Sequence, residues 1–257
     1  MMQASAFEYK HRFLIHALIY TLCFAAPWPD YHNGFHGIQL WSFMRNGSVW
    51  FHIANNLSRP LYTRFALFWN SALIVIVLFA FAGALLRTWG AAYLGASTVK
   101  RGGMVGDHVI ADGPFRFVRN PLYLGTILHT IALALLMRPE AAVLCVLLIT
   151  LLQLRLIGRE EPYLMAHLGE TYRAYVEEVP RIIPSVRPST APGTNHPDWK
   201  QGILSEFYMI GAAISFATLG WADSFSWENT VLHITQGILI SLGVSVVLRA
   251  FVPKSEF

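Results

Sequence analysis

The chain has 257 residues, of which 54% are hydrophobic and 13% are charged, and its formal net charge is +4. A soluble domain carries about 25% charged residues, so this composition excludes an ordinary water-exposed surface and favours a membrane environment. In a membrane protein a small basic excess usually lies in cytoplasmic loops, so we expect membrane lipids and no nucleic acid as partners.

Six apolar segments approach or reach the length of about 17–25 residues that a membrane-spanning helix needs. In chain order they cover residues 13–29, 65–86, 121–137, 140–157, 203–221 and 231–249. Only the short sequence Met137-Arg-Pro139 separates the third segment from the fourth, which indicates a tight helical hairpin. The predicted fold is therefore all-α: a polytopic membrane bundle of about six transmembrane helices, with a cytoplasmic amphipathic helix described below.

The first apolar segment also has features of a signal peptide. Lys10 and Arg12 precede it, and Ala25 and Ala26 resemble a cleavage site. We favour an uncleaved span, because the apolar segments that follow need an orienting helix. The two cysteines lie in apolar runs, which predicts small buried side chains rather than a disulfide framework.

The positions of the basic residues predict the orientation of the bundle. With a cytoplasmic N-terminus, fifteen Lys and Arg residues lie on the cytoplasmic side and four on the other. This asymmetry supports six spans with both termini in the cytoplasm, in the plasma or inner membrane if the chain is bacterial. Residues 35–54 stay open between an interfacial helix, a re-entrant piece and a further span, although a further span would spoil the asymmetry.

Four regions divide the chain. Residues 1–70 hold the first span and a connecting segment, and residues 71–185 form the core. Residues 186–202 include Pro192 and Gly193 and read as a linker. Residues 203–257 form a C-terminal hairpin of two membrane helices, which we interpret as an appendage to a four-span core.

A first polar stretch precedes the third span on its cytoplasmic side. Gly113-Pro114 is a turn signal, and Pro121 suits the first turn of a helix. Arg116 and Arg119 lie just before that helix begins. Their guanidinium groups, together with the backbone N–H groups at the helix start, would suit a carboxylate or a phosphate.

A second polar stretch, residues 155–184, follows the fourth span. Leu164, Leu168, Tyr172 and Tyr175 recur at helical spacing, which predicts an amphipathic helix. Arg155 and Arg159 are four residues apart on one helix face, where like charges repel. This repulsion predicts either a bound anion or a facing carboxylate.

Both stretches resemble signatures of a known superfamily. Residues 113–125 resemble the motif Gly-Pro-Tyr-Arg-x-x-Arg-His-Pro-x-Tyr-x-Gly of the isoprenylcysteine carboxyl methyltransferase and phospholipid methyltransferase superfamily. Its second signature is similar to Arg155-Leu-Ile-Gly-Arg-Glu-Glu161, Gly169-Glu-Thr-Tyr-Arg-Ala-Tyr175 and Val179-Pro-Arg-Ile-Ile-Pro184, and Leu86-Arg-Thr-Trp89 and Tyr93-Leu-Gly95 also fit. The resemblance covers about residues 75–185.

The resemblance implies an integral membrane methyltransferase that uses S-adenosylmethionine and a lipophilic or lipid acceptor. It carries the cofactor site onto Glu160 and Glu161, and onto Arg119, Pro121 and Tyr123. With these we predict cofactor-binding residues Arg116, Arg119, Asn120, Pro121, Tyr123, Gly125, Glu160, Glu161 and Tyr172, and catalytic residues Arg155, Arg181 and Tyr123. Asn120 replaces the family's usual histidine; it keeps hydrogen-bonding groups but cannot titrate. No Cys/His cluster has metal-ligand spacing, so we expect no metal.

Alternatives remain open from the sequence. The acceptor could be a prenylcysteine-like carboxylate, which needs no base, or a lipid amine, which must first lose a proton. A membrane NADPH-dependent reductase of related helical core is a second enzyme class. A non-catalytic transporter or scaffold fits less well, because the polar residues gather at the cytoplasmic edge rather than at the midplane. His129, inside the third span, fits either a functional group or a hydrogen bond to the backbone.

Overall fold

The structure is a computed structural model that describes residues 3–25, 49–58, 65–94, 108–218 and 227–251. In these ranges all regular structure is helical, so the predicted all-α class is confirmed for them. The elements are α1 (Ala6–Lys10), α2 (Arg12–Ala25), α4 (Val49–Ser58), α5 (Phe65–Leu94), the 3-10 helix η2 (Gly113–Arg116), α7 (Pro121–Ala134), α8 (Pro139–Glu178), α9 (Trp199–Thr218) and α10 (Trp227–Phe251).

Each of the six predicted spans overlaps a helix, although residues 26–29 of the first and 219–221 of the fifth lie outside the described residues. Two helices, Asn70–Leu94 and Pro139–Glu178, are long and apolar enough to cross a membrane. The apolar parts of α2, α7 and α10 are shorter in the described residues. Membrane association follows from these helices, whereas six crossings stay a prediction. Of the open segment 35–54, residues 35–48 lie outside the described residues and the remainder belongs to α4.

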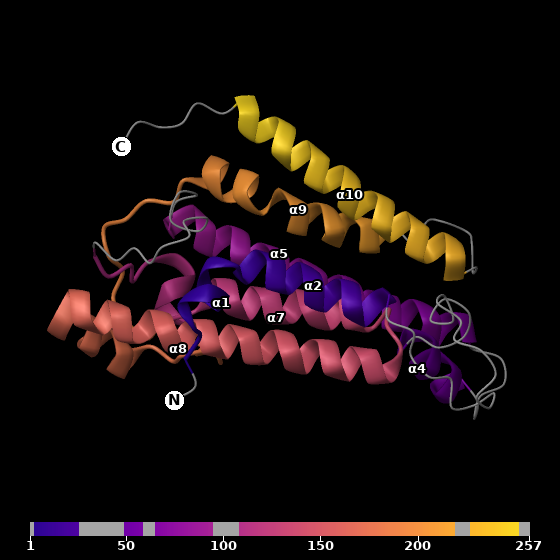
Figure 1. Cartoon of the computed structure of the whole chain (residues 1–257), viewed down its shortest axis with the longest axis horizontal. Coiled ribbons are helices and arrows are strands. Elements are labelled where there is room, and N and C mark those ends of the chain that lie inside the picture. The colour runs from indigo at the N-terminus through magenta and orange to yellow at the C-terminus, as the bar shows by residue number, and fades with distance from the viewer. Residues whose placement is uncertain (1–2, 26–48, 59–64, 95–107, 219–226, 252–257) are drawn as a thin grey trace.

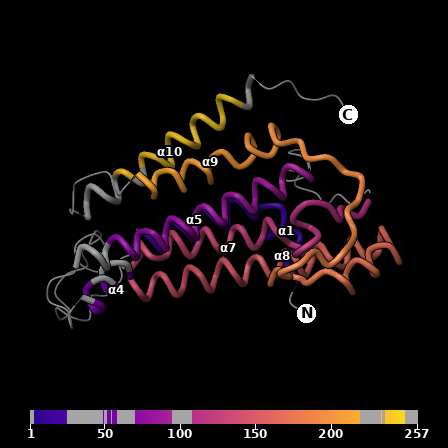
Figure 2. Tube along the Cα trace, turned by 180° about the vertical axis from the view of Figure 1, so that it is seen from behind, coloured from indigo at the N-terminus to yellow at the C-terminus, as the bar shows by residue number. Residues whose placement is uncertain are grey.

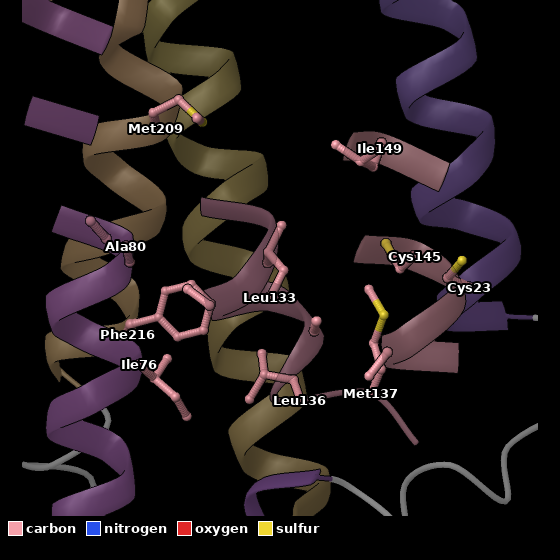
Figure 3. Close-up of a cluster of buried hydrophobic side chains, with 14 of the residues drawn as sticks. Cys23, Ile76, Ala80, Leu133, Leu136, Met137, Cys145, Ile149, Met209 and Phe216 are labelled. Atoms are coloured by element: carbon pink, nitrogen blue, oxygen red, sulfur yellow. The ribbon is translucent and has the colours of Figure 1, made fainter. Parts of the chain in front are cut away.

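The long helices run roughly side by side in an elongated bundle (Figures 1 and 2). Helix α5 lies between α7 and α9, and α10 is the outermost helix, against α9. Helices α2 and α7 pack on α8 at the other side of the bundle. In the core, Phe216 of α9 lies beside Ile76 of α5 and faces Leu133 of α7 (Figure 3). The C-terminal hairpin thus packs directly on the core.

The two cysteines lie in the same core, on α2 and α8 (Figure 3). Cys23 and Cys145 are both buried and both unpaired as disulfides. The prediction of small buried side chains is therefore confirmed. They fill space between two helices that belong to different regions of the sequence.

Helix α8 continues well beyond its apolar part. Residues 141–152 are apolar apart from Thr150, and the helix then runs through Glu160 and Glu161 to Glu178. Gly169 breaks it, with φ 57° and ψ −132°, a conformation that favours glycine. The predicted amphipathic helix is therefore the continuation of the fourth span, and Gly169 sets the direction of its last turns.

Many large apolar side chains are exposed on the outside of the bundle. They include Leu14, Leu18 and Leu22 on α2, Ile74, Leu78 and Leu85 on α5, Val143 and Leu147 on α8, and Leu239, Ile240 and Val246 on α10. Soluble monomers rarely expose contiguous apolar surface on this scale. A lipid environment accounts for these faces, in agreement with the low share of charged residues.

Helices α5 and α7 approach each other through a pair of glycines. A Cβ atom added at Gly83 would lie 2.6 Å from the carbonyl oxygen of Gly125 and 2.9 Å from the backbone nitrogen of His129. These atoms belong to a helix backbone and cannot rotate away. Small residues at such crossings let membrane helices pack closely.

Replacing Gly83 with Ala should lower the free energy of unfolding by about 1–3 kcal/mol, because the added methyl overpacks the contact between two backbones. Unfolding by SDS titration of the purified protein measures this. Gly243→Ala in α10 is the matched control, since no heavy atom of the described residues lies within 4 Å of its added Cβ. Equal stability of the two variants would contradict the close packing of α5 on α7.

Candidate functional site

A cavity of about 1020 Å³ lies between the N-terminal end of α7 and the middle of α8, around Glu160, and extends along α2 to the C-terminal hairpin. One part of its lining, called here the polar part, contains Tyr9, Arg12, Arg119, Asn120, Glu160 and Glu161. Another, called here the apolar part, contains His129, Leu133, Met209, Ala212, Leu242 and Ser245. Small-molecule sites occupy about 300–1,000 Å³, so the cavity has room for more than one ligand.

Glu161 ties three segments of the polar part together. Its carboxylate lies 3.3 Å from Nη1 of Arg119 and 3.0 Å from Nη2 of Arg181. The side-chain amide of Asn120 donates to the same carboxylate at 3.2 Å and to the carbonyl of Arg181 at 3.1 Å. With two guanidinium groups and an amide around it, Glu161 fixes the start of α7 and the chain after α8 to α8 itself.

Glu160 has a different environment, although it is the next residue. Its Oε1 accepts a hydrogen bond of 2.6 Å from the hydroxyl of Tyr9, and the hydroxyl of Tyr123 also donates to it. The side chain is only partly exposed, beyond the apolar part of α8, and it lines the cavity. Burial raises the pKa of Glu160 above its usual value, against the two phenol hydrogen bonds and the nearby Arg12. Among the described residues, the hydrogen-bond donors to the Glu160 carboxyl group are therefore phenols and not guanidinium groups.

The N-terminal segment is fastened to α8 beside this carboxyl group. Arg155 forms two hydrogen bonds to Glu8, of 3.0 and 2.8 Å, and these hold the pKa of Glu8 at about 2. Arg159 donates to the carbonyl of Ala4 at 3.0 Å, and the N–H of Ala4 donates to the carbonyl of Arg155. The repulsion predicted between the two arginines is therefore relieved by a facing carboxylate, and the same contacts bring Tyr9 to Glu160.

The segment between α8 and α9 covers the polar part. The N–H of Ser185 donates to the carbonyl of Phe117 at 3.0 Å, and the N–H of Ser189 donates to that of Arg116 at 2.8 Å. Farther on, the N–H of Asn195 donates to Asp112 at 3.1 Å. These bonds hold the segment against residues 112–120, so that Asn195 and His196 also line the cavity.

Aromatic side chains from the end of α8 form a further wall. Tyr172 is buried and packs against Tyr175, with ring centroids 5.9 Å apart. The hydroxyl of Tyr175 donates to the carbonyl of Phe115 at 2.8 Å. All three rings line the cavity, close to the partly exposed carboxyl groups. Aromatic faces at such a site suit a flat heterocycle or a cation.

A buried ion pair joins the core to the C-terminal hairpin at the cavity wall. Nε of Arg87 on α5 lies 2.7 Å from Oε2 of Glu206 on α9, and Nη2 lies 2.9 Å from Oε1. The guanidinium also donates to the carbonyl of Leu122 and the hydroxyl of Thr126 on α7. The pair therefore links α5, α7 and α9, and both carboxylate oxygens of Glu206 are taken by one guanidinium.

The helices that build the cavity include the part of the chain that matches a known family. Residues 71–171 match the family model described as phospholipid methyltransferase. The predicted resemblance to the methyltransferase superfamily is thereby confirmed over these residues, called here the phospholipid methyltransferase segment after the family that they match. Neither the comparison with curated proteins nor that with solved structures finds a match.

The phospholipid methyltransferase segment contains most of the predicted site. Of the predicted residues, seven line the cavity: Arg119, Asn120, Pro121, Tyr123, Glu160, Glu161 and Tyr172. All but Tyr172 lie within the segment, which spans α5, α7 and α8 as far as Thr171. The segment thus brings together residues from two stretches that are about 40 positions apart in the sequence.

Four predicted residues do not line the cavity. Arg155 pairs with Glu8, Arg181 pairs with Glu161, and the Nε of Arg116 donates to the carbonyl of Thr190 at 3.0 Å. Gly125 lies against α5, where an added Cβ would be 2.5 Å from Cγ of Arg87. These residues support the site from behind, because each holds another segment in place.

Several lining residues lie outside the phospholipid methyltransferase segment and were not among the predicted residues: Tyr9, Arg12, His196, Glu206 and Ser245. For the first two the sequence carries a signal. Ser5 and Glu8 have capping-box spacing, and Ser5 does accept from the N–H of Glu8 while Glu8 accepts from that of Ser5. This spacing predicts where α1 starts, but it does not predict that the N-terminal segment binds to α8.

Proposed function

We propose that the chain transfers a methyl group from S-adenosylmethionine to a lipophilic acceptor at the cytoplasmic side of a membrane. The main support is the environment of Glu160. Its carboxyl group lies on the cavity wall and, among the described residues, accepts hydrogen bonds from phenol hydroxyls and not from a guanidinium group. A cation can approach such a group without first displacing an ion pair. The match of residues 71–171 to a methyltransferase family supports the same reaction class.

The lining residues suit the parts of S-adenosylmethionine, a molecule with a carboxylate, an ammonium, a sulfonium, a ribose diol and adenine. Glu160 suits the ammonium or the ribose hydroxyls, and the guanidinium of Arg12 suits the carboxylate. Arg119, the earlier candidate for the carboxylate, already pairs with Glu161. Tyr172 and Phe115 offer aromatic faces to the adenine or the sulfonium.

When bound, S-adenosylmethionine supplies a methyl group activated by the positive sulfonium. The residues of the chain then orient the two reactants, because in-line displacement gains most of its rate from alignment. Tyr9 and Tyr123 hold the Glu160 carboxylate from two sides. The wall made by α9 and α10 keeps water from the acceptor, and exclusion of water strengthens the charge interactions within the cavity.

The proposed topology has six membrane crossings with both termini in the cytoplasm. Fifteen of the nineteen Lys and Arg residues support it. In this arrangement the polar part of the cavity opens to the cytoplasm, where a soluble donor is present. The apolar part lies at the depth of the bilayer, where a lipophilic acceptor is dissolved.

The test is binding and turnover with the full chain in lipid nanodiscs. Calorimetry should detect saturable binding of S-adenosylmethionine, and radiolabel from its methyl group should enter the lipid extract. NADPH is the competing ligand in the same assay. Saturable binding of NADPH without binding of S-adenosylmethionine would overturn the proposal in favour of a reductase.

The hydroxyl of Tyr9 should control how donor affinity depends on pH. Burial raises the pKa of Glu160 in the free protein, whereas a bound cationic donor favours the carboxylate and so lowers that pKa. Affinity should therefore rise with pH up to the pKa of Glu160 and level off above it. Tyr9→Phe removes a donor to the charged form, so the pKa rises further, the rise in affinity moves to higher pH, and affinity below it falls about two- to tenfold.

Calorimetric titrations of S-adenosylmethionine across pH measure this shift. Tyr175→Phe is the matched control, since it removes a phenol hydroxyl that bonds to a backbone carbonyl and not to Glu160. The control should leave the position of the pH dependence unchanged. An unchanged position in Tyr9→Phe would show that α1 does not act on Glu160.

A further inference from the structure

The apolar part of the cavity carries two buried polar atoms without partners. Within the described part of the chain, Nδ1 of His129 and Oγ of Ser245 have no hydrogen-bond partner, and their residues are 5% and 3% exposed. One lies on α7 in the core and the other on α10 in the C-terminal hairpin. Both line the same cavity. A buried polar group without a hydrogen bond destabilises the fold, so these two atoms point to a ligand with polar groups of its own.

The hydrogen bonding of His129 defines what that ligand offers. The imidazole ring interacts with the backbone of Ala80 on α5. Nδ1 has no hydrogen-bond partner among the described residues, and a hydroxyl group suits this nitrogen in either tautomer of the neutral ring, because it both donates and accepts. A ligand therefore satisfies His129 with a hydroxyl group. The hydroxyl of Ser245 can donate to a ligand oxygen of any kind.

The charges of the cavity wall indicate that this ligand group is neutral. Among the described residues near the apolar part, the charged side chains are Arg87 and Glu206, which pair with each other. An ammonium or a phosphate there would be buried without an opposite charge, at high cost. A pure hydrocarbon chain would leave both polar atoms unsatisfied. A neutral oxygenated lipophile avoids both penalties.

We propose that the apolar part of the cavity binds a neutral lipophile with a hydroxyl group, which donates to Nδ1 of His129 while a ligand oxygen accepts from Ser245. The site gives the C-terminal hairpin a role in ligand selection, outside the segment that matches the methyltransferase family. A role of this lipophile as the methyl acceptor rests on the proposed function. Binding of the lipophile itself does not require the methyl donor.

Photolabelling with three probes of equal length tests the site. They are a long-chain primary alcohol, its methyl ether and the parent alkane, each with the same diazirine in the chain, added to the full chain in nanodiscs. Labelled protein is quantified by mass spectrometry. The alcohol should be captured about two- to tenfold more than the ether, because only the alcohol can donate to Nδ1, and the ether more than the alkane.

Two variants separate the two side chains. His129→Leu should abolish the preference for the alcohol over the ether without changing capture of the ether. Ser245→Ala should lower capture of both the alcohol and the ether, since both contain an oxygen. Ser241→Ala is the matched control one turn away, where the hydroxyl bonds to the carbonyl of Gly237 and does not line the cavity.

Equal capture of the three probes by the unmodified chain would overturn the proposal. The proposal would also be overturned if the His129→Leu variant still preferred the alcohol and the Ser245→Ala variant captured as much ether as the unmodified chain. Should His129→Leu fail to fold, Ser245→Ala still decides, because it removes one atom from an outer helix. Binding of S-adenosylmethionine is measured in parallel. Failure to bind S-adenosylmethionine would contradict the proposed function, whereas loss of selective probe capture would contradict the lipophile site.

Discussion

Replacing Glu160 with Gln should lower the affinity for S-adenosylmethionine about 10- to 100-fold. The substitution keeps the size of the side chain and removes its negative charge. Hydrogen bonds to a charged group contribute about 1.5–3 kcal/mol, and each 1.4 kcal/mol is a factor of ten in affinity. The amide can still accept from Tyr9, so the wall of the cavity should stay in place. Calorimetry in nanodiscs measures the loss.

The pH dependence gives this prediction a second measurement. In the unmodified chain the affinity should rise with pH, because donor binding releases the proton that the raised pKa of Glu160 favours. In Glu160→Gln the rise should disappear. Glu170→Gln is the control on the same helix, since that side chain is 82% exposed and outside the cavity. Unchanged affinity in Glu160→Gln would remove the main support for the proposed function.

Helix positions followed closely from the sequence. In a membrane protein an apolar run of about 20 residues is itself the signal, since the backbone must satisfy its hydrogen bonds internally. Each predicted span accordingly overlaps a helix. The sequence predicted the lengths of the helices less well. Helix α8 continues through residues 158–178, because a polar sequence can extend a helix that an apolar segment has already begun.

The two ordered signatures contain residues that the fold brings together at one cavity, whereas their roles stay predictions. Glu160, Glu161, Arg119 and Tyr123 do line one cavity. What the sequence could not separate was the role of the two adjacent glutamates. Glu161 is enclosed by Arg119, Arg181 and Asn120, whereas Glu160 meets two phenols. That difference depends on which way each side chain points from the helix, and on Tyr9, which is 151 positions away in the chain.

The contribution of the C-terminal hairpin was also hidden from the sequence. The sequence predicts a linker at residues 186–202. In the structure this segment forms hydrogen bonds to residues 112–120, and its His196 lines the cavity. Glu206 lies inside an apolar segment. A single carboxylate there predicts a polar or basic partner, but the sequence does not identify which residue it is. Only the packing of α9 on α5 identifies that partner as Arg87.

Breaking the ion pair of Arg87 and Glu206 should be the most destabilising single change in the chain. Glu206 is 1% exposed, and Glu206→Ala leaves the guanidinium buried without its counter-charge. Removing one partner of a buried pair costs about 3–5 kcal/mol. SDS titration should show this loss in the free energy of unfolding. Glu170→Ala is the control: it breaks the exposed pair with Arg173 and should cost less than about 1 kcal/mol.

The double variant Arg87→Met, Glu206→Met separates the cost of an unpaired charge from the value of the pair. Two apolar side chains of similar length leave no buried charge, and such replacements are often close to neutral in stability. We therefore expect the double variant to regain most of the stability that Glu206→Ala loses. A double variant as unstable as the single one would contradict this expectation. It would show that the bonds of Arg87 to Leu122 and Thr126, which only the double variant removes, stabilise the fold about as much as removal of the unpaired charge does.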